Sequence, residues 1–271
     1  MMRALWSAAS GMISQQTNVD TISNNIANVN TVGYKTEKAE FKSLLYQTIQ
    51  SPTTTANGAR KPIDAQVGLG SRTASITSYF TQGSLIDSEN DTAFAIEGRG
   101  FFAIRGENGE TYYTRNGNFG LAVGNQGMLL TDSDGHPVLD TQGNIISFPA
   151  DMKSSALVAD RDGSFYLKNN DGSITDLNIQ IGLFQFSNPA GLKKLPGTIY
   201  EVTDASGEAM NEATTPGLII SSIKQGYLEN SNVQVADEMV NLIVAQRAYE
   251  MNSKAIQAAD DMLNTANNLR R

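Results

Sequence analysis

Cysteine is absent from the 271-residue chain, and histidine occurs once, at position 136. The lack of cysteine excludes thiolate catalysis, zinc–thiolate sites and disulfide bonds together. Long apolar runs are also missing: residues 242–245 form one of the longest, far short of the roughly 20 residues that a membrane-spanning helix needs. The first residues include one arginine but no long apolar stretch, so they do not resemble a cleaved signal peptide. We therefore expect no membrane insertion and no export by the general secretion route.

Positive charge is in deficit, because 20 Lys and Arg residues stand against 28 Asp and Glu residues, which gives a formal net charge of −8. Phosphate backbones and anionic membrane surfaces are both recognised through basic surfaces. The composition therefore argues against nucleic acid as a partner.

Motifs for catalysis or ligand binding are weak. His136 stands in the sequence DSDGHP (residues 132–137), which is typical of a turn, and a metal site or a Ser–His pair needs partners that the spacing does not supply. Residues 132–135 and 160–163 each resemble part of a calcium loop but lack its third oxygen ligand and distal glutamate. We expect a protein that is not an enzyme, with no catalytic residue, metal site or cofactor.

A heptad pattern is present at each end of the chain. A sustained seven-residue period keeps one stripe of a helix against a partner helix. Small and polar residues flank both stripes, which predicts two helices packed along a narrow seam, within one molecule or between neighbours. The alternative is that each helix packs on the chain's own core. The stripe is Leu5, Met12, Val19 and Ile26 in the first helix, with Ile22 beside it, and Val235, Leu242, Tyr249, Ile256 and Leu263 in the second.

The flanking residues predict where these helices begin and end. The first should run from Met2 to about Ile26 and stop in an asparagine cluster, because Asn and Gly tolerate the left-handed conformation that closes a helix. Ser231 followed by Gln234 fits a capping box, which predicts that the second helix begins at Ser231.

Between the helices the pattern changes to strands and turns. Residues 39–49 suit either a helix or a strand, and both possibilities stay open. Residues 51–62, with two prolines and three consecutive threonines, are typical of an exposed loop or extended arm. Residues 179–186 are the most apolar run and the expected central strand. Frequent turn dipeptides indicate an antiparallel β-domain of hairpins: Asn108-Gly109, Asn116-Gly117, Asp134-Gly135, Gln142-Gly143, Asp162-Gly163 and Asp171-Gly172.

These patterns predict an α+β protein whose terminal helices form one unit that is discontinuous in sequence. Residues 1–35 and 229–271 would form an inner coiled-coil domain. Residues 36–75 would form an extended arm, and residues 76–228 an antiparallel β-rich outer domain inserted between the helices.

Two long segments resemble the signatures of one family. Residues 23–35 (SNNIANVNTVGYK) and 238–254 (EMVNLIVAQRAYEMNSK) are similar to the N- and C-terminal signatures of bacterial flagellar rod and hook axial proteins, in the same order. Residues 41–49, 67–70, 96–102 and 113–117 also match a rod member, whereas hook proteins are usually longer. The motif positions are Asn25, Asn28, Thr31, Gly33, Tyr34, Gln246, Arg247, Tyr249 and Glu250.

The resemblance implies a structural protein that polymerises with copies of itself into a helical rod of the basal body, across the cell wall or periplasm. The heptad residues would pack in its inner layer, while Asn25, Asn28, Thr31 and Gly33 would fix the exit from the first helix. Arg247 and Glu250 would contact neighbouring subunits.

The implied partners are other rod proteins, the hook protein, ring or bushing proteins and the flagellar type III export apparatus. Two alternatives stay open: another axial paralogue of this family, and a cell-wall-binding β-protein on a coiled-coil stalk.

Overall fold

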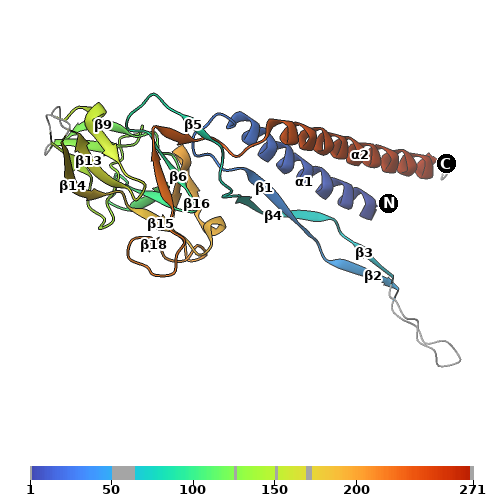
Figure 1. The fold of residues 1–271 in the computed structure, drawn as a ribbon. Coiled ribbons are helices and arrows are strands. Elements are labelled where there is room, and N and C mark those ends of the chain that lie inside the picture. Colours follow the sequence, from blue (N-terminus) through green and yellow to red (C-terminus); the bar gives the residue numbers. More distant parts are fainter. Residues whose placement is uncertain (1, 51–64, 125–126, 150–151, 169–172, 269–271) are drawn as a thin grey trace. The chain divides into compact units, whose positions relative to one another are not determined.

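The computed structural model describes residues 2–50, 65–124, 127–149, 152–168 and 173–268. The predicted loop at 51–62 and the Asp171-Gly172 turn lie outside the described residues. The chain has a helix at each end and antiparallel strands between them, which confirms the α+β class (Figure 1). It divides into two compact units: the first takes in Met1–Ala27, Glu37–Thr77 and Gln234–Arg271, and the second Asn28–Thr36 and Ser78–Val233.

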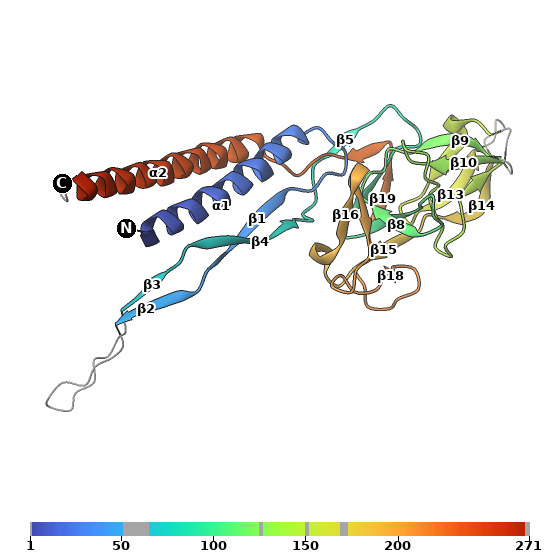
Figure 2. The ribbon, with the colours of Figure 1, turned by 180° about the vertical axis from the view of Figure 1, so that it is seen from behind.

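Two helices of opposite direction lie side by side in the first unit: α1 (Met2–Ala27) and α2 (Val235–Asn268) (Figure 1, Figure 2). Asn25, near the end of α1, contacts Glu238, near the start of α2. Gly11 lies against Asn252, much further along α2, as an antiparallel pair requires. Within the described ranges, no helix has both the length and the apolarity needed to cross a membrane.

The predicted limits of α1 are confirmed, but the predicted start of α2 is wrong. The helix begins at Val235 rather than at Ser231. The Ser231 hydroxyl accepts a hydrogen bond from the Val233 N–H (3.3 Å). The Asn232 side chain accepts from Thr36 and donates to the Tyr79 carbonyl. These contacts hold residues 231–233 outside the helix, so the local capping pattern does not decide where the helix begins.

The strands of the first unit form two successive strand pairs. The strands are β1 (Glu37–Ser43), β2 (Tyr46–Gln50), β3 (Ala65–Gly68) and β4 (Ser71–Ser78), and we call the two pairs together the ribbon. β1 pairs with β4, and β2 pairs with β3 in antiparallel fashion. The Leu44 N–H donates to the Gly70 carbonyl (2.8 Å) and continues the pairing from one ladder to the next. The open question over residues 39–49 is thereby answered in favour of strands. Small residues connect α1 to the ribbon, since the hydroxyl oxygens of Ser14 and Ser71 lie 3.1 Å apart.

The second unit is an antiparallel β-domain. Its largest sheet has six strands in the order β16-β17-β8-β7-β15-β18. Two three-stranded sheets, β11-β10-β9 and β12-β13-β14, and two pairs, β19-β6 and β20-β5, complete it. The strands are β5 (Leu85–Asp87), β6 (Phe94–Glu97), β7 (Phe101–Arg105), β8 (Thr111–Thr114), β9 (Gly120–Gly124), β10 (Gly127–Thr131), β11 (Ser147–Phe148), β12 (Leu157–Ala159), β13 (Ser164–Lys168), β14 (Ile174–Gln180), β15 (Leu183–Gln185), β16 (Lys193–Leu195), β17 (Ile199–Glu201), β18 (Met210–Asn211), β19 (Ser222–Gln225) and β20 (Tyr227–Glu229).

The core of the second unit lies on both faces of β7. Successive side chains of a strand point to opposite faces. Accordingly, Phe102 and Ile104 enter the larger apolar cluster, while Phe101 and Ala103 enter a smaller one. All four side chains are fully buried, so this sheet is covered on both faces.

The prediction of one central strand at residues 179–186 is wrong. The run divides into the end of β14, at the edge of a three-stranded sheet, and β15, in the interior of the six-stranded sheet. The break falls at Gly182, where an added Cβ would lie 2.8 Å from the Asp140 carbonyl oxygen. The chain turns here from one sheet to the next, and apolarity alone could not indicate that turn.

Candidate assembly site

In the first unit, most of the predicted heptad residues lie on the packed sides of the two helices. Ile22 is buried, and Leu5, Met12, Val19 and Ile26 are half-buried. In α2, Leu242, Ile256 and Leu263 are half-buried, while Val235 and Tyr249 keep 45% and 42% of their surface exposed. The fully buried residues of α2 are Glu238, Ala245 and Ala259, again in heptad steps. The small side chains of Ala245 and Ala259 let the helices approach closely.

A second apolar stripe of α2 remains exposed. At 100° per residue its centre lies roughly 140° around the helix from the buried stripe. The heptad pattern predicted one narrow seam and not this second stripe, although residues 239–244 are apolar at five of six positions. Its larger members are 53–65% exposed: Val240, Ile243, Val244, Met251 and Met262.

Several signature residues of α2 border a shallow pocket between the helices. The pocket measures about 380 Å³ and is lined by Gln16, Val19, Gln246, Tyr249 and Glu250. The Arg247 guanidinium pairs with the Glu250 carboxylate at 2.9 Å, and both side chains are more than half exposed. This pair stays within one helix and leaves both groups accessible.

Asn25 joins α1, β1 and α2 within the first unit. Its side-chain amide donates to the Glu37 carbonyl (2.8 Å), and its oxygen accepts from the Glu37 N–H (2.9 Å). The same amide nitrogen lies 3.3 Å from the Glu238 carboxylate. Asn25 is 1% exposed, so these bonds are shielded from water. A side chain with both a donor and an acceptor is needed to pair with one residue's backbone in this way.

The rest of the N-terminal signature shapes a turn in the second unit. The Thr31 N–H and hydroxyl donate to the carbonyl and side-chain oxygens of Asn28. Gly33 has a φ of +71°, and its N–H donates to the Glu229 carbonyl (2.8 Å). The Tyr34 ring is buried, with the Lys194 ammonium 4.5 Å from its centroid.

Gly33→Ala is expected to destabilise the second unit by about 3 kcal/mol, because it adds steric overlap to an unfavourable backbone conformation. A Cβ at this position would lie 2.7 Å from the Asn116 nitrogen. Urea unfolding measures the loss. Gly109→Ala is the matched control, because Gly109 also has positive φ (+81°) but has nothing within 4 Å of the added Cβ. It should cost only about 1 kcal/mol, and equal losses from the two variants would contradict the steric account.

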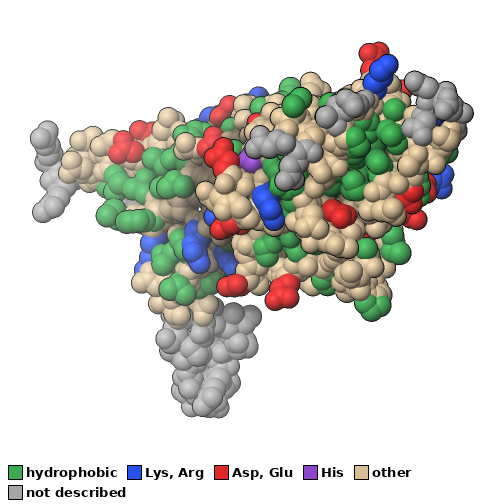
Figure 3. Space-filling model, turned by 90° about the vertical axis from the view of Figure 1, so that its left-hand side faces the viewer, with side chains coloured by type: hydrophobic (Ala, Val, Ile, Leu, Met, Phe, Trp, Pro, Cys, Tyr) green, Lys and Arg blue, Asp and Glu red, His purple; other side chains and the backbone are tan. Residues whose placement is uncertain are grey.

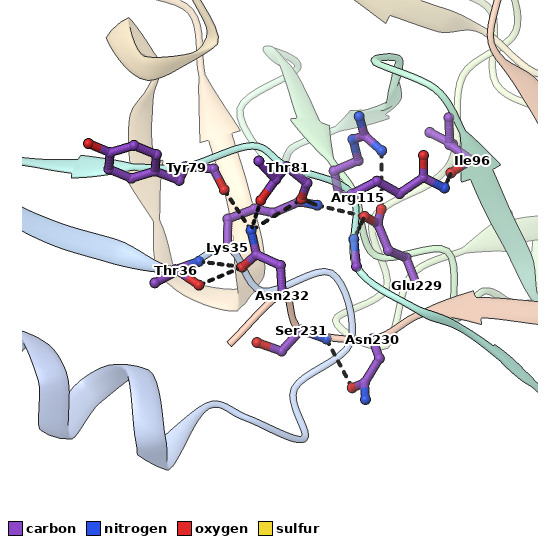
Figure 4. A network of polar contacts seen from close by, with 12 residues as sticks. Lys35, Thr36, Tyr79, Thr81, Ile96, Arg115, Glu229, Asn230, Ser231 and Asn232 are labelled. Atoms are coloured by element: carbon purple, nitrogen blue, oxygen red, sulfur yellow. Dashed lines mark hydrogen bonds and ion pairs between the residues drawn. The ribbon is translucent and has the colours of Figure 1, made fainter. Parts of the chain in front are cut away.

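Three charged side chains form a buried network in the second unit (Figure 4). The Lys35 ammonium lies 2.6 Å from Glu229 Oε1, and the Arg115 guanidinium lies 3.1 Å from Glu229 Oε2. All three side chains are at most 1% exposed. Further bonds run from Lys35 to the Thr81 carbonyl (2.8 Å) and from Arg115 to the Gly98 carbonyl (2.7 Å). One carboxylate therefore serves two buried cations.

Burying these three charges costs solvation free energy, which their mutual attraction must offset. Burial lowers the pKa of the Lys35 ammonium and of the Arg115 guanidinium, and the charge of Glu229 opposes both shifts. Glu229 Oε1 also accepts from the Gly83 N–H (2.9 Å). Removing one partner from such a network leaves a buried charge without compensation, which costs far more than an exposed pair contributes.

Beside this network, the Asn232 side chain forms hydrogen bonds to two other segments of the chain, at Thr36 and at residues 79–81 (Figure 4). Its oxygen accepts from the Thr36 N–H and hydroxyl, both at 2.7 Å. Its amide donates to the Tyr79 carbonyl (2.9 Å) and the Thr81 hydroxyl (2.7 Å). The structural roles of Lys35, Arg115, Glu229 and Asn232 were not predicted from the sequence. The only local signal was that Lys35 ends the N-terminal signature at residues 23–35.

Family comparisons agree with the resemblance of residues 23–35 and 238–254 to the signatures of flagellar axial proteins. The chain matches models described as "Flagella basal body rod protein" at residues 5–35, "Flagellar hook protein FlgE/F/G D1 domain" at 95–160, and "Flagellar basal body rod FlgEFG protein C-terminal" at 224–269. The first match covers α1 from Leu5 onward, and the last contains the whole of α2. The chain belongs to the family of flagellar basal-body rod proteins.

Several similar relatives are FlgG proteins. The flagellar basal-body rod protein FlgG of Borreliella burgdorferi is 42% identical over the full length of both chains. FlgG of Agrobacterium fabrum is also 42% identical, over 96% of this chain and 97% of its own. FlgG of Bacillus subtilis is 38% identical over both full lengths, against 30% for the hook-basal body complex protein FlhP of the same organism. The chain is a structural, FlgG-like rod subunit of the flagellar basal body, as its motifs predicted.

Proposed function

We propose that the chain polymerises with copies of itself into the distal rod, with α1 and α2 in the inner, coiled-coil layer. The observation that carries this proposal is the exposed stripe of α2, where Val240, Ile243 and Val244 are each 55–62% exposed. Burying apolar surface contributes about 25 cal/mol per Å². Identical subunits that repeat a contact that does not close form a helical filament. A second copy covering this stripe would supply the driving force for assembly, and the rod forms because this contact repeats without closing.

The finer assignments follow from the same proposal. Residues 36–75 would act as the extended arm and residues 76–228 as the outer β-domain, exposed toward ring or bushing proteins. Subunits would leave the cell through the type III export apparatus. The finished rod would cross the periplasm or cell wall, meet other rod proteins and the hook protein at its ends, and transmit torque.

Electron microscopy and sedimentation of the full-length chain at rising concentration test this proposal. Tubes or protofilaments with a helical repeat are the expected result. Discrete closed oligomers would instead favour the alternative of a stalked, cell-wall-binding protein, because a contact that closes cannot build a rod.

A further inference from the structure

A separate cluster of ligand-type side chains lies in the turn that follows β10 in the second unit. Asp132 and Asp134 each offer a carboxylate oxygen and His136 a ring nitrogen, and these atoms lie within 4.8 Å of one another. The turn is closed by a hydrogen bond from the Asp132 N–H to the His136 carbonyl (2.9 Å). Figure 3 shows the histidine, in purple, at the surface with acidic side chains, in red, beside it.

Two buried atoms of this cluster have no hydrogen-bond partner. Asp132 is 4% exposed, and its Oδ1 accepts from the Ser133 N–H (2.7 Å), whereas its Oδ2 has no partner. His136 Nδ1 is likewise buried and unpartnered. Buried polar atoms in folded proteins are nearly always paired, and each exception calls for an explanation such as an ion. An ion held between these two residues would satisfy both.

We propose that Asp132, Asp134 and His136 bind a divalent transition-metal cation such as Zn²⁺. Imidazole and carboxylate together suit Zn²⁺ and its neighbours, whereas Ca²⁺ and Mg²⁺ prefer all-oxygen sites. Two carboxylates supply the negative charge, and tetrahedral ligands about 2.1 Å from one ion lie about 3.4 Å apart, so side-chain rotation would have to bring the ligand atoms closer together on binding. The neighbouring position 197 is glycine, where a Cβ would lie 3.0 Å from an Asp134 carboxylate oxygen. The lack of a side chain there keeps that carboxylate accessible. The cation would fasten the turn to the β-domain.

Calorimetric titration of dilute full-length chain with ZnCl₂ tests the proposal. We expect one Zn²⁺ per chain and a rise in the melting temperature of about 5 °C at a hundredfold excess over the dissociation constant. Asp132→Asn and His136→Gln should each weaken binding about tenfold or more. Without metal, Asp132→Asn should melt no lower than the parent chain, because it removes a buried charge whose Oδ2 has no hydrogen-bond partner. Loss of Zn²⁺ binding by this variant would then not reflect unfolding.

The matched control lies in the turn at residues 160–163. Asp160 and Asp162 share the Asp-X-Asp-Gly sequence, but both are exposed and no histidine follows them. Asp162→Asn should leave Zn²⁺ affinity unchanged. As a second readout, Co²⁺ should broaden the imidazole resonances of His136, which are unambiguous because the chain has one histidine, and Asp132→Asn should abolish the broadening. The proposal is overturned if no saturable binding occurs, if Asp132→Asn and His136→Gln leave the affinity for Zn²⁺ unchanged, or if Ca²⁺ binds as tightly as Zn²⁺.

Discussion

Glu229→Gln is expected to destabilise the second unit by about 3–5 kcal/mol, because it leaves two buried cations without their shared anion. Lys35 and Arg115 contact the two carboxylate oxygens of Glu229 at 2.6 and 3.1 Å. A glutamine at this position keeps the shape but presents an NH₂ group to one of the cations. Urea unfolding followed by near-ultraviolet circular dichroism of tyrosine measures the loss. Fluorescence of Trp6, the only tryptophan, reports separately on α1.

An exposed ion pair of the same unit provides the control. Lys193 and Glu201 lie 2.7 Å apart with 60% and 34% of their side-chain surface exposed. Glu201→Gln should cost at most about 0.5–1 kcal/mol, since solvent screens such pairs. Adding Lys35→Met to Glu229→Gln should recover part of the loss, because it removes one of the stranded charges. Similar losses from Glu229→Gln and Glu201→Gln would show that burial does not set the energy of the network.

Features that depend on neighbouring residues were predictable from the sequence. The heptad at Leu5, Met12, Val19 and Ile26 predicted α1 to within a residue of its observed end, because helical period is a local property. The turn dipeptides predicted an antiparallel β-domain for the same reason. At Gly109, Gly135, Gly143 and Gly163 the backbone adopts the positive φ that such turns need.

Features set by distant partners were not predictable. Glu229 lies 194 residues from Lys35 and 114 from Arg115, so no local pattern indicates that they meet. The capping motif at Ser231 failed because Asn232 bonds to Thr36 and Tyr79, which lie far away in the sequence. In both cases tertiary contacts outweighed local preference.

The candidate site was predictable in part. One heptad stripe of α2 was identified from its period, but the exposed stripe at Val240, Val244 and Met251 was not. Both stripes have helical spacing and lie in the same helix. The period therefore indicated a helix with apolar sides, but it did not reveal that one of these sides would stay exposed. Exposure in the folded chain makes that distinction.

Val244→Asp is expected to abolish polymerisation while leaving the fold of the subunit intact. Val244 is 62% exposed in the isolated chain, so a carboxylate there stays hydrated until a neighbouring copy covers it. Losing the burial of a valine and desolvating a charge together cost about 4 kcal/mol per contact, which raises the critical concentration about a thousandfold. Sedimentation and electron microscopy measure the change, with circular dichroism to confirm that the helices persist.

Substitutions on other faces make this prediction specific. Val123→Asp makes the same substitution at an 88% exposed position of β9, outside the helices. This variant should polymerise like the parent chain. Tyr249→Asp and Ile256→Asp should also block assembly, but Ile256→Asp should in addition weaken the packing of α1 on α2, because Ile256 is half-buried within the subunit. All three helix variants should leave the β-domain folded. Normal rods from Val244→Asp would mean that the exposed stripe of α2 is not a subunit contact, and the inner layer would then have to be built through the half-buried seam alone.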